Sequence, residues 1–299
     1  MRKTVAVGVD GSEESLGAAR YAAAMARRRR DSLTLTHGFL YPTGYASLGF
    51  APFAPALPTE PRADSQALMD EVAAIVKGEY PDIELHTAQA AESGQLALIE
   101  QSRTADVVVL GHRGLGGFPE LLLGSVAAQV VAYAHSPVVV FRPSETNAVD
   151  APIVVGVDGS PESALALAFA CEEAAERHVS LQAIHVYRDT GEGSAGPEAF
   201  LSAALRPSVA TYPQLDIRRE TRPVLFLEDT ALRFRVRPAD NAEAVFVDAS
   251  RHASLVVVGS RGRGGMTGLL LGSVSQALVH CAHSPVAVIH SHTDSPSHE

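Results

Sequence analysis

Short apolar runs recur along the chain, and two of them are almost the same sequence. Residues 5–9 and residues 153–157 are each nearly all apolar, and each run is followed by Asp-Gly-Ser. A run of this length without alternation is typical of a strand that is buried on both faces of its sheet. The serine after each run, Ser12 or Ser160, is a good helix N-cap, and an alanine-rich segment comes next. Each run therefore predicts a buried strand that leads directly into a helix.

The same alternation continues through both halves of the chain. The next predicted strands are residues 33–37, 83–87, 107–110 and 138–141 in the first half and residues 181–186, 215–220, 255–258 and 286–289 in the second. Further helices are expected to begin near Ser125 and Ser273. Strands that alternate with helices form parallel sheets covered on both faces, with right-handed crossovers. The sequence therefore predicts an α/β fold of two tandem doubly wound domains, at residues 1–143 and 152–290.

The two halves are copies of one sequence. Asp10 and Asp158, like Gly111 and Gly259, are separated by 148 positions. Between residues 106–140 and 254–288, 20 of 35 positions are identical without a gap. A unit of this length can form a domain with its own core. We therefore expect the chemistry of one copy to occur again in the other.

The copies differ in their middle parts. Residues 38–65 of the first copy are rich in proline, glycine and aromatic residues, and are interpreted either as a lid or interface or as a mobile loop. The second copy has an insertion near residues 224–237, which predicts either an added hairpin or an irregular surface loop. If each copy holds a binding site, these differing segments would cover it, so we expect the two sites to have unequal affinities.

Composition narrows the classes of function. The 299 residues carry a formal net charge of −10, with 46% hydrophobic and 19% charged residues, which is an ordinary globular composition. The negative charge argues against a nucleic acid or a membrane surface as partner. Cys171 and Cys281 occupy unmatched positions in the copies, so they predict neither a disulfide nor a metal site. No apolar stretch reaches the length of a signal-peptide core or a membrane span, and we expect a cytoplasmic protein.

The glycine-rich connection after the fourth strand carries the strongest chemical signal. In each copy a glycine leaves the strand and a Gly-Ser pair opens the next helix, at Gly124 and Gly272. Glycines let a ligand approach the backbone, and the free N–H groups at a helix start attract anions. Candidate sources of positive charge beside the connection are Arg113, Arg261 and Arg263. The pattern predicts a phosphate cradle; the alternative is that these glycines only build a tight connection.

Two carboxylates and four histidines are also repeated. Asp10 and Asp158 each end a first strand, where a carboxylate can accept hydrogen bonds from ribose or hold a metal bound to phosphates. The alternative is a turn-forming Asp-Gly pair. The aligned histidines are His37 with His185 and His135 with His283. No carboxylate or cysteine accompanies them at ligand spacing, so we interpret them as polar groups bonded to nearby backbone.

The spacing Gly-x2-Gly-x9-Gly-Ser, found twice, resembles the signature of the universal stress protein family in its tandem-domain form. The sequence Val-Gly-Val-Asp-Gly-Ser at the start of each half supports this, and the resemblance covers nearly the whole chain except the middle parts. It implies five-stranded sheets in the order 3-2-1-4-5 and ATP binding. It further implies intramolecular pairing of the two domains through their fifth strands and a homodimer.

Carried over residue by residue, the resemblance implies one adenine-nucleotide site in each domain. The nucleoside would lie against Gly8 and Asp10, and again against Gly156 and Asp158. The phosphates, with Mg²⁺, would lie along Gly111, His112, Arg113, Gly114, Gly116, Gly117, Gly124, Ser125 and Val126. In the second domain the corresponding residues are Gly259, Ser260, Arg261, Gly262, Arg263, Gly265, Gly272, Ser273, Val274 and Ser275.

The resemblance implies an ATP-binding sensor or regulator of stress responses whose protein partner the sequence does not identify. Two other functions stay open, a slow ATPase or nucleotidyl-transfer enzyme on the same kind of fold, and a nucleotide-free adaptor whose repeat serves pairing. The residues favour binding over turnover, because the chain has no Gly-x4-Gly-Lys-Ser/Thr loop and no lysine near either glycine-rich connection. We therefore assign no catalytic residue and no metal held by side chains alone.

Overall fold

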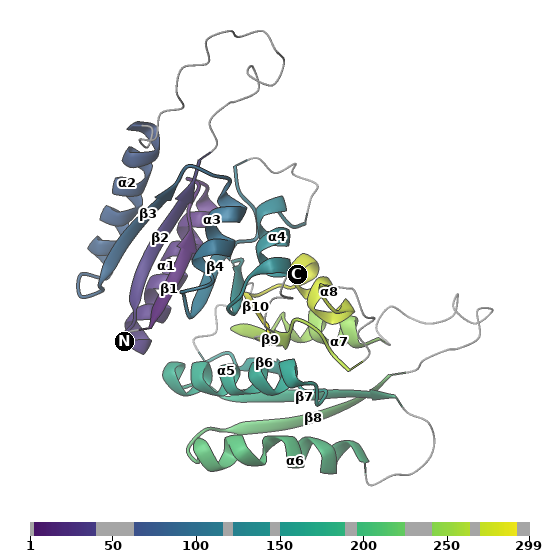
Figure 1. Cartoon of the computed structure of the whole chain (residues 1–299). Helices are drawn as coiled ribbons and strands as arrows, with labels where there is room; N and C mark the ends of the chain where they lie inside the picture. Colours follow the sequence, from purple (N-terminus) through teal and green to yellow (C-terminus); the bar gives the residue numbers. More distant parts are fainter. Residues whose placement is uncertain are drawn as a thin grey trace, which may run out of the picture. The chain divides into compact units, whose positions relative to one another are not determined.

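Strands and helices alternate within each copy in the computed structural model, as the apolar runs predict (Figure 1). The structure describes residues 3–39, 63–115, 122–143, 150–188, 196–224, 241–263 and 270–291. The chain divides into two compact units, Met1–Ser136 and Pro137–Glu299. The predicted α/β fold, with two copies of a doubly wound arrangement, is confirmed.

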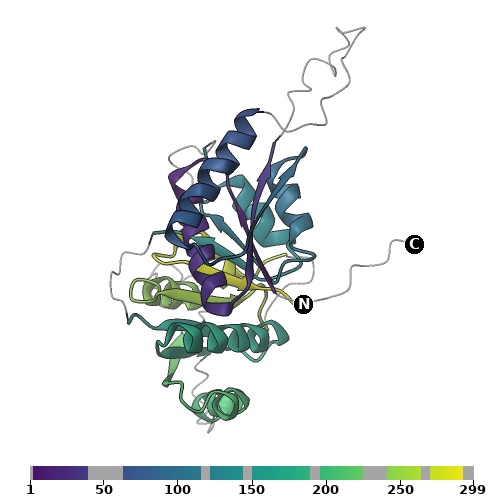
Figure 2. The same ribbon diagram turned by 90° about the vertical axis from the view of Figure 1, so that its left-hand side faces the viewer.

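The first unit holds a parallel sheet between two layers of helices. Its elements are β1 (Thr4–Gly8), α1 (Glu13–Arg29), β2 (Ser32–Gly38), α2 (Ala63–Glu79), β3 (Leu85–Ala90), α3 (Gly94–Gln101), β4 (Val107–Gly111) and α4 (Ser125–Tyr133). The strand order is β3-β2-β1-β4, and these neighbours are parallel. Helices α1 and α2 lie on one face of the sheet and α3 and α4 on the other (Figure 2). This arrangement brings the ends of β1 and β4 together at one edge.

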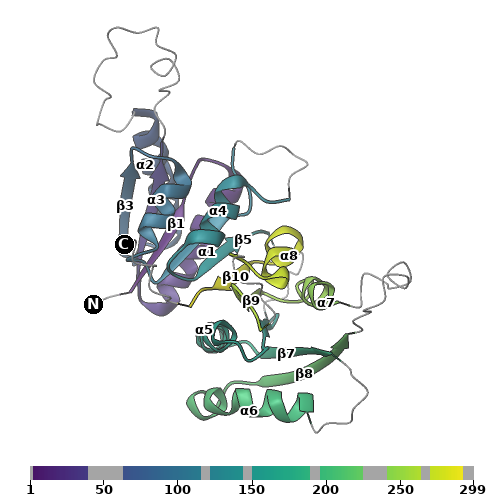
Figure 3. The same ribbon diagram turned by 45° about the vertical axis from the view of Figure 1, so that its right-hand side comes forward.

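The second unit repeats the pattern and contains one additional strand. Its elements are β5 (Val138–Phe141), β6 (Ile153–Gly156), α5 (Pro161–Arg177), β7 (Leu181–Arg188), α6 (Gly196–Thr211), β8 (Ile217–Val224), α7 (Ala242–Ala249), β9 (Leu255–Gly259), α8 (Ser273–Cys281) and β10 (Val286–Ile289). The strand order is β5-β10-β9-β6-β7-β8. Helices α7 and α8 lie side by side (Figure 3). Read from β8 to β10, the strands have the predicted 3-2-1-4-5 order.

The additional strand, β5, is the fifth strand of the first copy. It lies beside β10, the fifth strand of the second copy, and runs antiparallel to it, with Val139 opposite Ala287. Both residues are fully buried. The predicted pairing of the two fifth strands is therefore confirmed, and β5 packs with the second unit.

Serine caps start the first helix of each copy, as predicted. The Ser12 hydroxyl accepts the N–H of Ser15 at 3.1 Å, and the Ser160 hydroxyl accepts the N–H of Ser163 at the same distance. Such a cap stabilises a helix by about 1 kcal/mol. Because the capping serine directly follows the strand-end Asp-Gly pair, each cap also fixes the direction in which the chain leaves the strand.

The divergent middle parts are where the structure differs from the sequence-based expectations. The third strands, β3 and β8, begin two residues later than predicted, because the apolar residues Ile83 and Leu215 belong to the preceding turns. Helices α2, α3, α6 and α7 form where the sequence predicts no element. Most of the predicted lid, residues 40–62, and most of the predicted hairpin, residues 225–237, lie outside the described residues.

Candidate functional site

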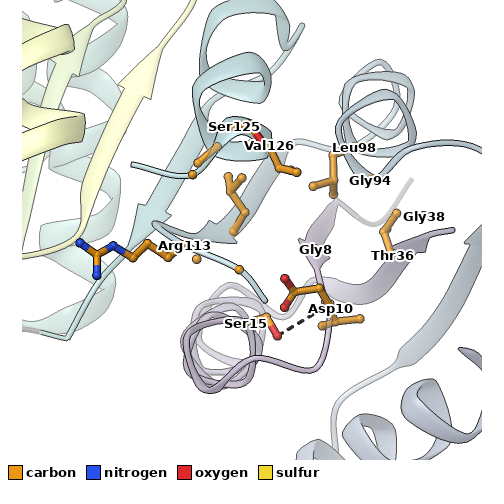
Figure 4. A pocket seen from close by; sticks show the side chains of 16 residues that line it. Gly8, Asp10, Ser15, Thr36, Gly38, Gly94, Leu98, Arg113, Ser125 and Val126 are labelled. Carbon is orange, nitrogen blue, oxygen red and sulfur yellow. Dashed lines mark hydrogen bonds between the residues drawn. The ribbon is translucent and has the colours of Figure 1, made fainter. Parts of the chain in front are cut away.

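A cavity of about 410 Å³ lies in the first unit at the carboxyl ends of β1, β2 and β4. Its walls also include the starts of α1, α3 and α4 (Figure 4). Eight predicted site residues line it: Gly8, Asp10, Gly111, Arg113, Gly114, Gly124, Ser125 and Val126. Parallel sheets bind ligands outside the carboxyl ends of their strands, and this volume suits a small metabolite. The cavity is therefore the candidate site of the first copy.

Asp10 joins two parts of the cavity wall. Its Oδ1 accepts hydrogen bonds from the backbone N–H and the hydroxyl of Ser12, at 3.0 and 2.6 Å. Its Oδ2 accepts the backbone N–H of Leu115, in the glycine-rich connection, at 3.0 Å. Oδ1 thus accepts two hydrogen bonds, whereas Oδ2 accepts one and has a further lone pair for a ligand donor. Asp10 thus holds both the turn after β1 and the connection after β4.

Hydrogen bonding favours the ionised form of this carboxylate. Burial alone would raise the pKa of Asp10, but the hydrogen bonds from Ser12 and Leu115, with a smaller contribution from Ser15, hold that pKa below its ordinary value of 3.8. In the second copy the pKa of Asp158 is lowered in the same way, against the effect of burial. Each carboxylate is therefore negative at neutral pH.

These lowered pKa values predict an acid-sensitive contribution to stability. A folded-state pKa below the unfolded-state value stabilises the fold above the unfolded pKa, and this stability is lost as the pH falls through the folded pKa. We expect Asp10→Asn and Asp158→Asn each to lower the free energy of unfolding at pH 7 by about 1–2 kcal/mol. Below about pH 4 the variants should lose less further stability than the wild-type protein. Urea denaturation at several pH values measures both effects.

The matched control for this prediction is Asp82→Asn, at an exposed aspartate outside the site. It should keep the wild-type stability and the wild-type acid profile. If the wild-type protein and the three variants all lost stability in parallel between about pH 4 and about pH 2, the carboxylates of Asp10 and Asp158 would not be the source of the acid sensitivity.

Packing explains why two of the glycines that recur in both copies are glycine. A Cβ on Gly114 would lie 2.1 Å from Oδ2 of Asp10. A Cβ on Gly111 would lie 3.0 Å from the carbonyl oxygen of Arg113 and 3.1 Å from Cβ of Glu14 at the start of α1. Glycine at these positions lets the connection lie directly against the carboxylate and the first turn of α1.

Gly124 has no such packing constraint. Its φ is −73°, and an added Cβ would lie 3.5 Å from the nearest atoms, an ordinary contact. It is the N-cap of α4, and no side chain caps this helix start. The first N–H groups of a helix have no intrahelical acceptor, and the first two residues of α4, Ser125 and Val126, line the cavity. An uncapped helix start beside a cavity is suited to an anion.

The hydrogen bonds around Asp158 in the second copy repeat those around Asp10. Oδ1 of Asp158 accepts the N–H and the hydroxyl of Ser160 at 2.9 and 2.7 Å, and Oδ2 accepts the N–H of Arg263 at 2.9 Å. A Cβ on Gly262 would lie 2.5 Å from Oδ2 of Asp158. The turn and the connection are therefore joined through a carboxylate in both copies.

Helix α8 begins in the same way as α4. Its N-cap is Gly272, without a side-chain cap, and the N–H of Gly272 donates to the carbonyl of Ser260 at 2.8 Å, as that of Gly124 does to His112. Ser273 and Val274 form its first turn, and the Ser275 hydroxyl donates to the Ser260 carbonyl at 3.0 Å. The predicted helix starts are confirmed in both copies.

A sequence model of the Universal stress protein family matches residues 1–142 and again residues 151–290. The chain belongs to the universal stress protein family. A universal stress protein from Mycolicibacterium smegmatis is 34% identical over 299 residues, which cover 95% of this chain and 96% of the relative. Because the likeness spans both copies, the tandem arrangement is shared with that relative.

Solved structures of the family show the same fold. The crystal structure of a universal stress protein from Archaeoglobus fulgidus superposes with a TM-score of 0.59 at 18% identity, and covers 96% of this chain and 98% of its own. A universal stress protein from Archaeoglobus fulgidus in complex with dAMP matches 46% of this chain and 94% of its own, at 20% identity and a TM-score of 0.34.

The sequence predicts that Arg113 adds positive charge to the first site of this universal stress protein, and that Arg261 and Arg263 add it to the second. The Arg113 side chain lines the cavity, but its guanidinium extends away from Asp10 (Figure 4). Nη2 of Arg261 lies 3.6 Å from Oε1 of Glu162, and the Arg263 guanidinium lies 5.3 Å from the centre of the Phe200 ring. Among the described lining residues, the backbone N–H groups at the start of α4 are therefore the groups suited to an anion. Outside the described residues lie Gly116, Gly117 and Gly265.

Half of the cavity wall was not predicted from the sequence. The additional lining residues are Val9, Ser15, Thr36, Gly38, Gly94, Leu98, Leu110 and Ala127. Thr36 pairs with Gly8 across β1 and β2, so aligning the predicted strand ends identifies it. Gly94 and Leu98 come from α3, which the sequence does not predict, and no motif marks them.

Of the four histidines predicted to bond to nearby backbone, His37 and His185 do so, whereas Nδ1 of His283 lies 3.5 Å from Nη1 of Arg251. Nδ1 of His37 donates to the carbonyl of Val9 at 2.7 Å, and Nδ1 of His185 donates to that of Val157 at 2.7 Å. Each histidine thus ties the end of a second strand to the residue before the site aspartate.

The residues of the site fit Mg²⁺ only as a companion of a phosphate ligand. Among the described residues, no three His, Cys, Asp or Glu side chains gather where they could hold a metal ion. Mg²⁺ is usually bound by one or two carboxylates together with substrate phosphates and water, and Asp10 is a carboxylate on this cavity wall.

Within the described ranges, no helix combines the length and apolarity needed to cross a bilayer.

Proposed function

We propose that this universal stress protein binds ATP in the cavity of its first copy and acts as a nucleotide-dependent sensor in stress responses. The observation that carries the proposal is the uncapped start of α4 on the cavity wall at Gly124, where packing leaves room for a side chain. The phosphates would bind these N–H groups and the glycine-rich connection. The sequence predicts a corresponding site in the second copy.

The rest of the cavity suits the nucleoside. Asp10, at the carboxyl end of β1, is placed to accept a ribose hydroxyl. Beyond it, Val9, Leu98 and Leu110 offer apolar surface for a flat base, and Gly38 lines the cavity at the end of β2. An apolar pocket with a few fixed polar groups is the usual form of a small-molecule site. We therefore infer that adenosine lies toward β2 and α3 and the phosphates toward α4.

The lining supports retention of ATP more than its hydrolysis. No lysine lines the cavity, and Lys3 and Lys77 are the two lysines of the chain. Asp10 already accepts three hydrogen bonds, so it is poorly placed to activate a water. Release of ADP in the presence of Mg²⁺, compared with a variant that cannot bind, tests the alternative of a slow ATPase. A rate above the variant's would establish turnover.

Gly124→Ala tests the site directly. A Cβ at this position fits the protein but would enter the space we assign to the phosphates, so we expect ATP affinity to fall about tenfold or more. The fold should lose about 1 kcal/mol, since alanine is a poorer N-cap than glycine. Isothermal titration calorimetry and thermal melting measure the two effects. Unchanged affinity in a folded variant would contradict the assignment.

The assembly and location of the protein remain proposals. We infer that the chain forms a homodimer in the cytoplasm and that ATP changes its contacts with a protein partner. Sedimentation velocity with and without ATP measures the first of these, and a single monomeric species in both conditions would contradict it. A nucleotide-free adaptor, the other alternative, predicts no ultraviolet signature of nucleotide in freshly purified protein and no heat of ATP binding.

A further inference from the structure

The two copies keep one side of the candidate site and change the other. Ten of the cavity residues recur unchanged 148 positions later, among them the aspartate, the connection glycines and the Gly-Ser helix start. Five others are replaced by larger residues, and Leu110 by the smaller Val258. The five changes are Thr36 to Ile184, Gly38 to Val186, Gly94 to Ala242, Leu98 to Phe246 and Ala127 to Ser275. Four of them lie at the end of the second strand and on the helix after the third strand, where we place the nucleoside.

Backbone geometry shows that these positions are equivalent. Thr36 pairs with Gly8 in the first unit, and Ile184 pairs with Gly156 in the second. In the first copy, a Cβ on Gly38 would lie 2.7 Å from the backbone N and Cα of Gly94. This close approach between the strand end and the helix start frames the first cavity. In the second copy the side chains of Val186 and Ala242 prevent the strand end and the helix start from approaching each other this closely.

Phe246 occupies the corresponding space in the second copy. Its side chain is 5% exposed, and its Cζ lies 3.0 Å from where a Cβ of Gly156 would be. Ile184, which pairs with Gly156 on the neighbouring strand, is 2% exposed. In the first copy Leu98 packs against Gly8 in the same way, but it does so as part of the wall of an open cavity. A phenyl ring in place of an isobutyl group fills more of this region, so a base would have to displace a buried ring.

The polar character of this region differs as well. Thr36 is 4% exposed, and its Oγ1 has no hydrogen-bond partner among the described residues. A buried hydroxyl without a partner is costly, and a ligand atom on the cavity side can supply one after rotation of the side chain about χ1. Ile184 offers no such group. The first copy therefore has an unused hydrogen-bonding group at the nucleoside end, and the second has hydrocarbon.

We propose that the chain binds one nucleotide, in its first copy, and that Ile184 and Phe246 close the second copy to the nucleoside. This inference rests on the proposed function of the first cavity. The second copy keeps the carboxylate-held connection and the uncapped helix start, but not the space that a base requires. Both copies thus keep the aspartate, the glycine-rich connection and the uncapped helix start, but the first copy alone keeps the nucleoside pocket.

The stoichiometry of ATP binding to the full chain is the first test. Isothermal titration calorimetry and native mass spectrometry should give one equivalent of ATP per chain. Two equivalents of comparable affinity would overturn the inference while supporting the proposed function. Absence of any binding would overturn both, so the two failures are distinguishable.

Reciprocal substitutions between the copies give the second test. Thr36→Ile with Leu98→Phe places the residues of the second copy in the first, and should weaken ATP binding about tenfold or more. Ile184→Thr with Phe246→Leu makes the opposite change and should leave the affinity of the first site unchanged. Thermal melting verifies that both variants fold. Loss of the bound equivalent in the second variant, or unchanged affinity in a folded first variant, would overturn the inference.

Discussion

Gly114→Ala is expected to abolish ATP binding, with a dissociation constant at least about a hundredfold higher than that of the wild-type protein. The added Cβ would lie 2.1 Å from Oδ2 of Asp10, so the carboxylate and the connection cannot keep their present positions. The bond from the Leu115 N–H to that oxygen would then break, and with it the tie between the connection and β1. Titration calorimetry on the full chain measures the change.

Gly262→Ala is the matched control, because it introduces the same clash in the second copy. Its Cβ would lie 2.5 Å from Oδ2 of Asp158. Both variants should lose stability by similar amounts, about 1–3 kcal/mol, since each forces a well-packed turn to shift. If the first copy alone binds nucleotide, Gly262→Ala should keep the wild-type affinity within about twofold. Equal affinities in the two variants would show that the clash at Gly114 does not act on the ligand site.

Arg142→Ala is expected to have the largest effect on stability, about 3 kcal/mol in the free energy of unfolding. The Arg142 guanidinium, just after β5, donates to the carbonyl oxygens of Val279 at 2.6 Å and Ala282 at 2.8 Å, and at 3.4 Å to that of His280. These are carbonyls of the last turn of α8, which lack intrahelical donors and carry the negative end of the helix dipole. Removing the guanidinium leaves part-buried acceptors unpaired.

Two further substitutions test this interpretation of Arg142. Lysine retains the charge but not the planar fork of donors, so Arg142→Lys should recover less than half of the lost stability. Arg103→Ala removes an exposed arginine that pairs with Glu100 and should cost less than about 0.5 kcal/mol. Guanidinium chloride denaturation followed by circular dichroism measures all three. An Arg142→Ala variant as stable as Arg103→Ala would contradict the proposed anchoring of β5 to α8.

The sequence correctly predicts those elements whose residue types suit both the local backbone conformation and the position of the element in the fold. Residues 138–141 and 286–289 are continuous apolar runs after a proline, and they form β5 and β10 at the predicted bounds. Ser12 and Ser160 are caps by residue type and by position, and both cap helices. Repetition strengthens such predictions, because a pattern that occurs twice at constant spacing is unlikely to be accidental.

The nucleoside side of the cavity could not be predicted, because tertiary contacts create it. Leu98 is an ordinary leucine in a short helix, and only packing against Gly8 gives it a place in the wall. The directions of the Arg113 and Arg261 side chains likewise depend on neighbours that no local pattern specifies. Glycine spacing indicates where a ligand's phosphates can approach, whereas the selection of the base depends on residues that carry no motif.

The antiparallel pairing of β5 with β10 affects how this chain can be divided experimentally. The sequence repeat suggests a fragment that starts near residue 150, but such a fragment would lack β5. It would leave Val286, Ala287 and Val288, all fully buried in the whole chain, along an open sheet edge. An apolar edge with unpaired N–H and C=O groups promotes association with another chain. A fragment that begins at Pro137 retains its own edge strand, and is the one suited to binding measurements on the second copy alone.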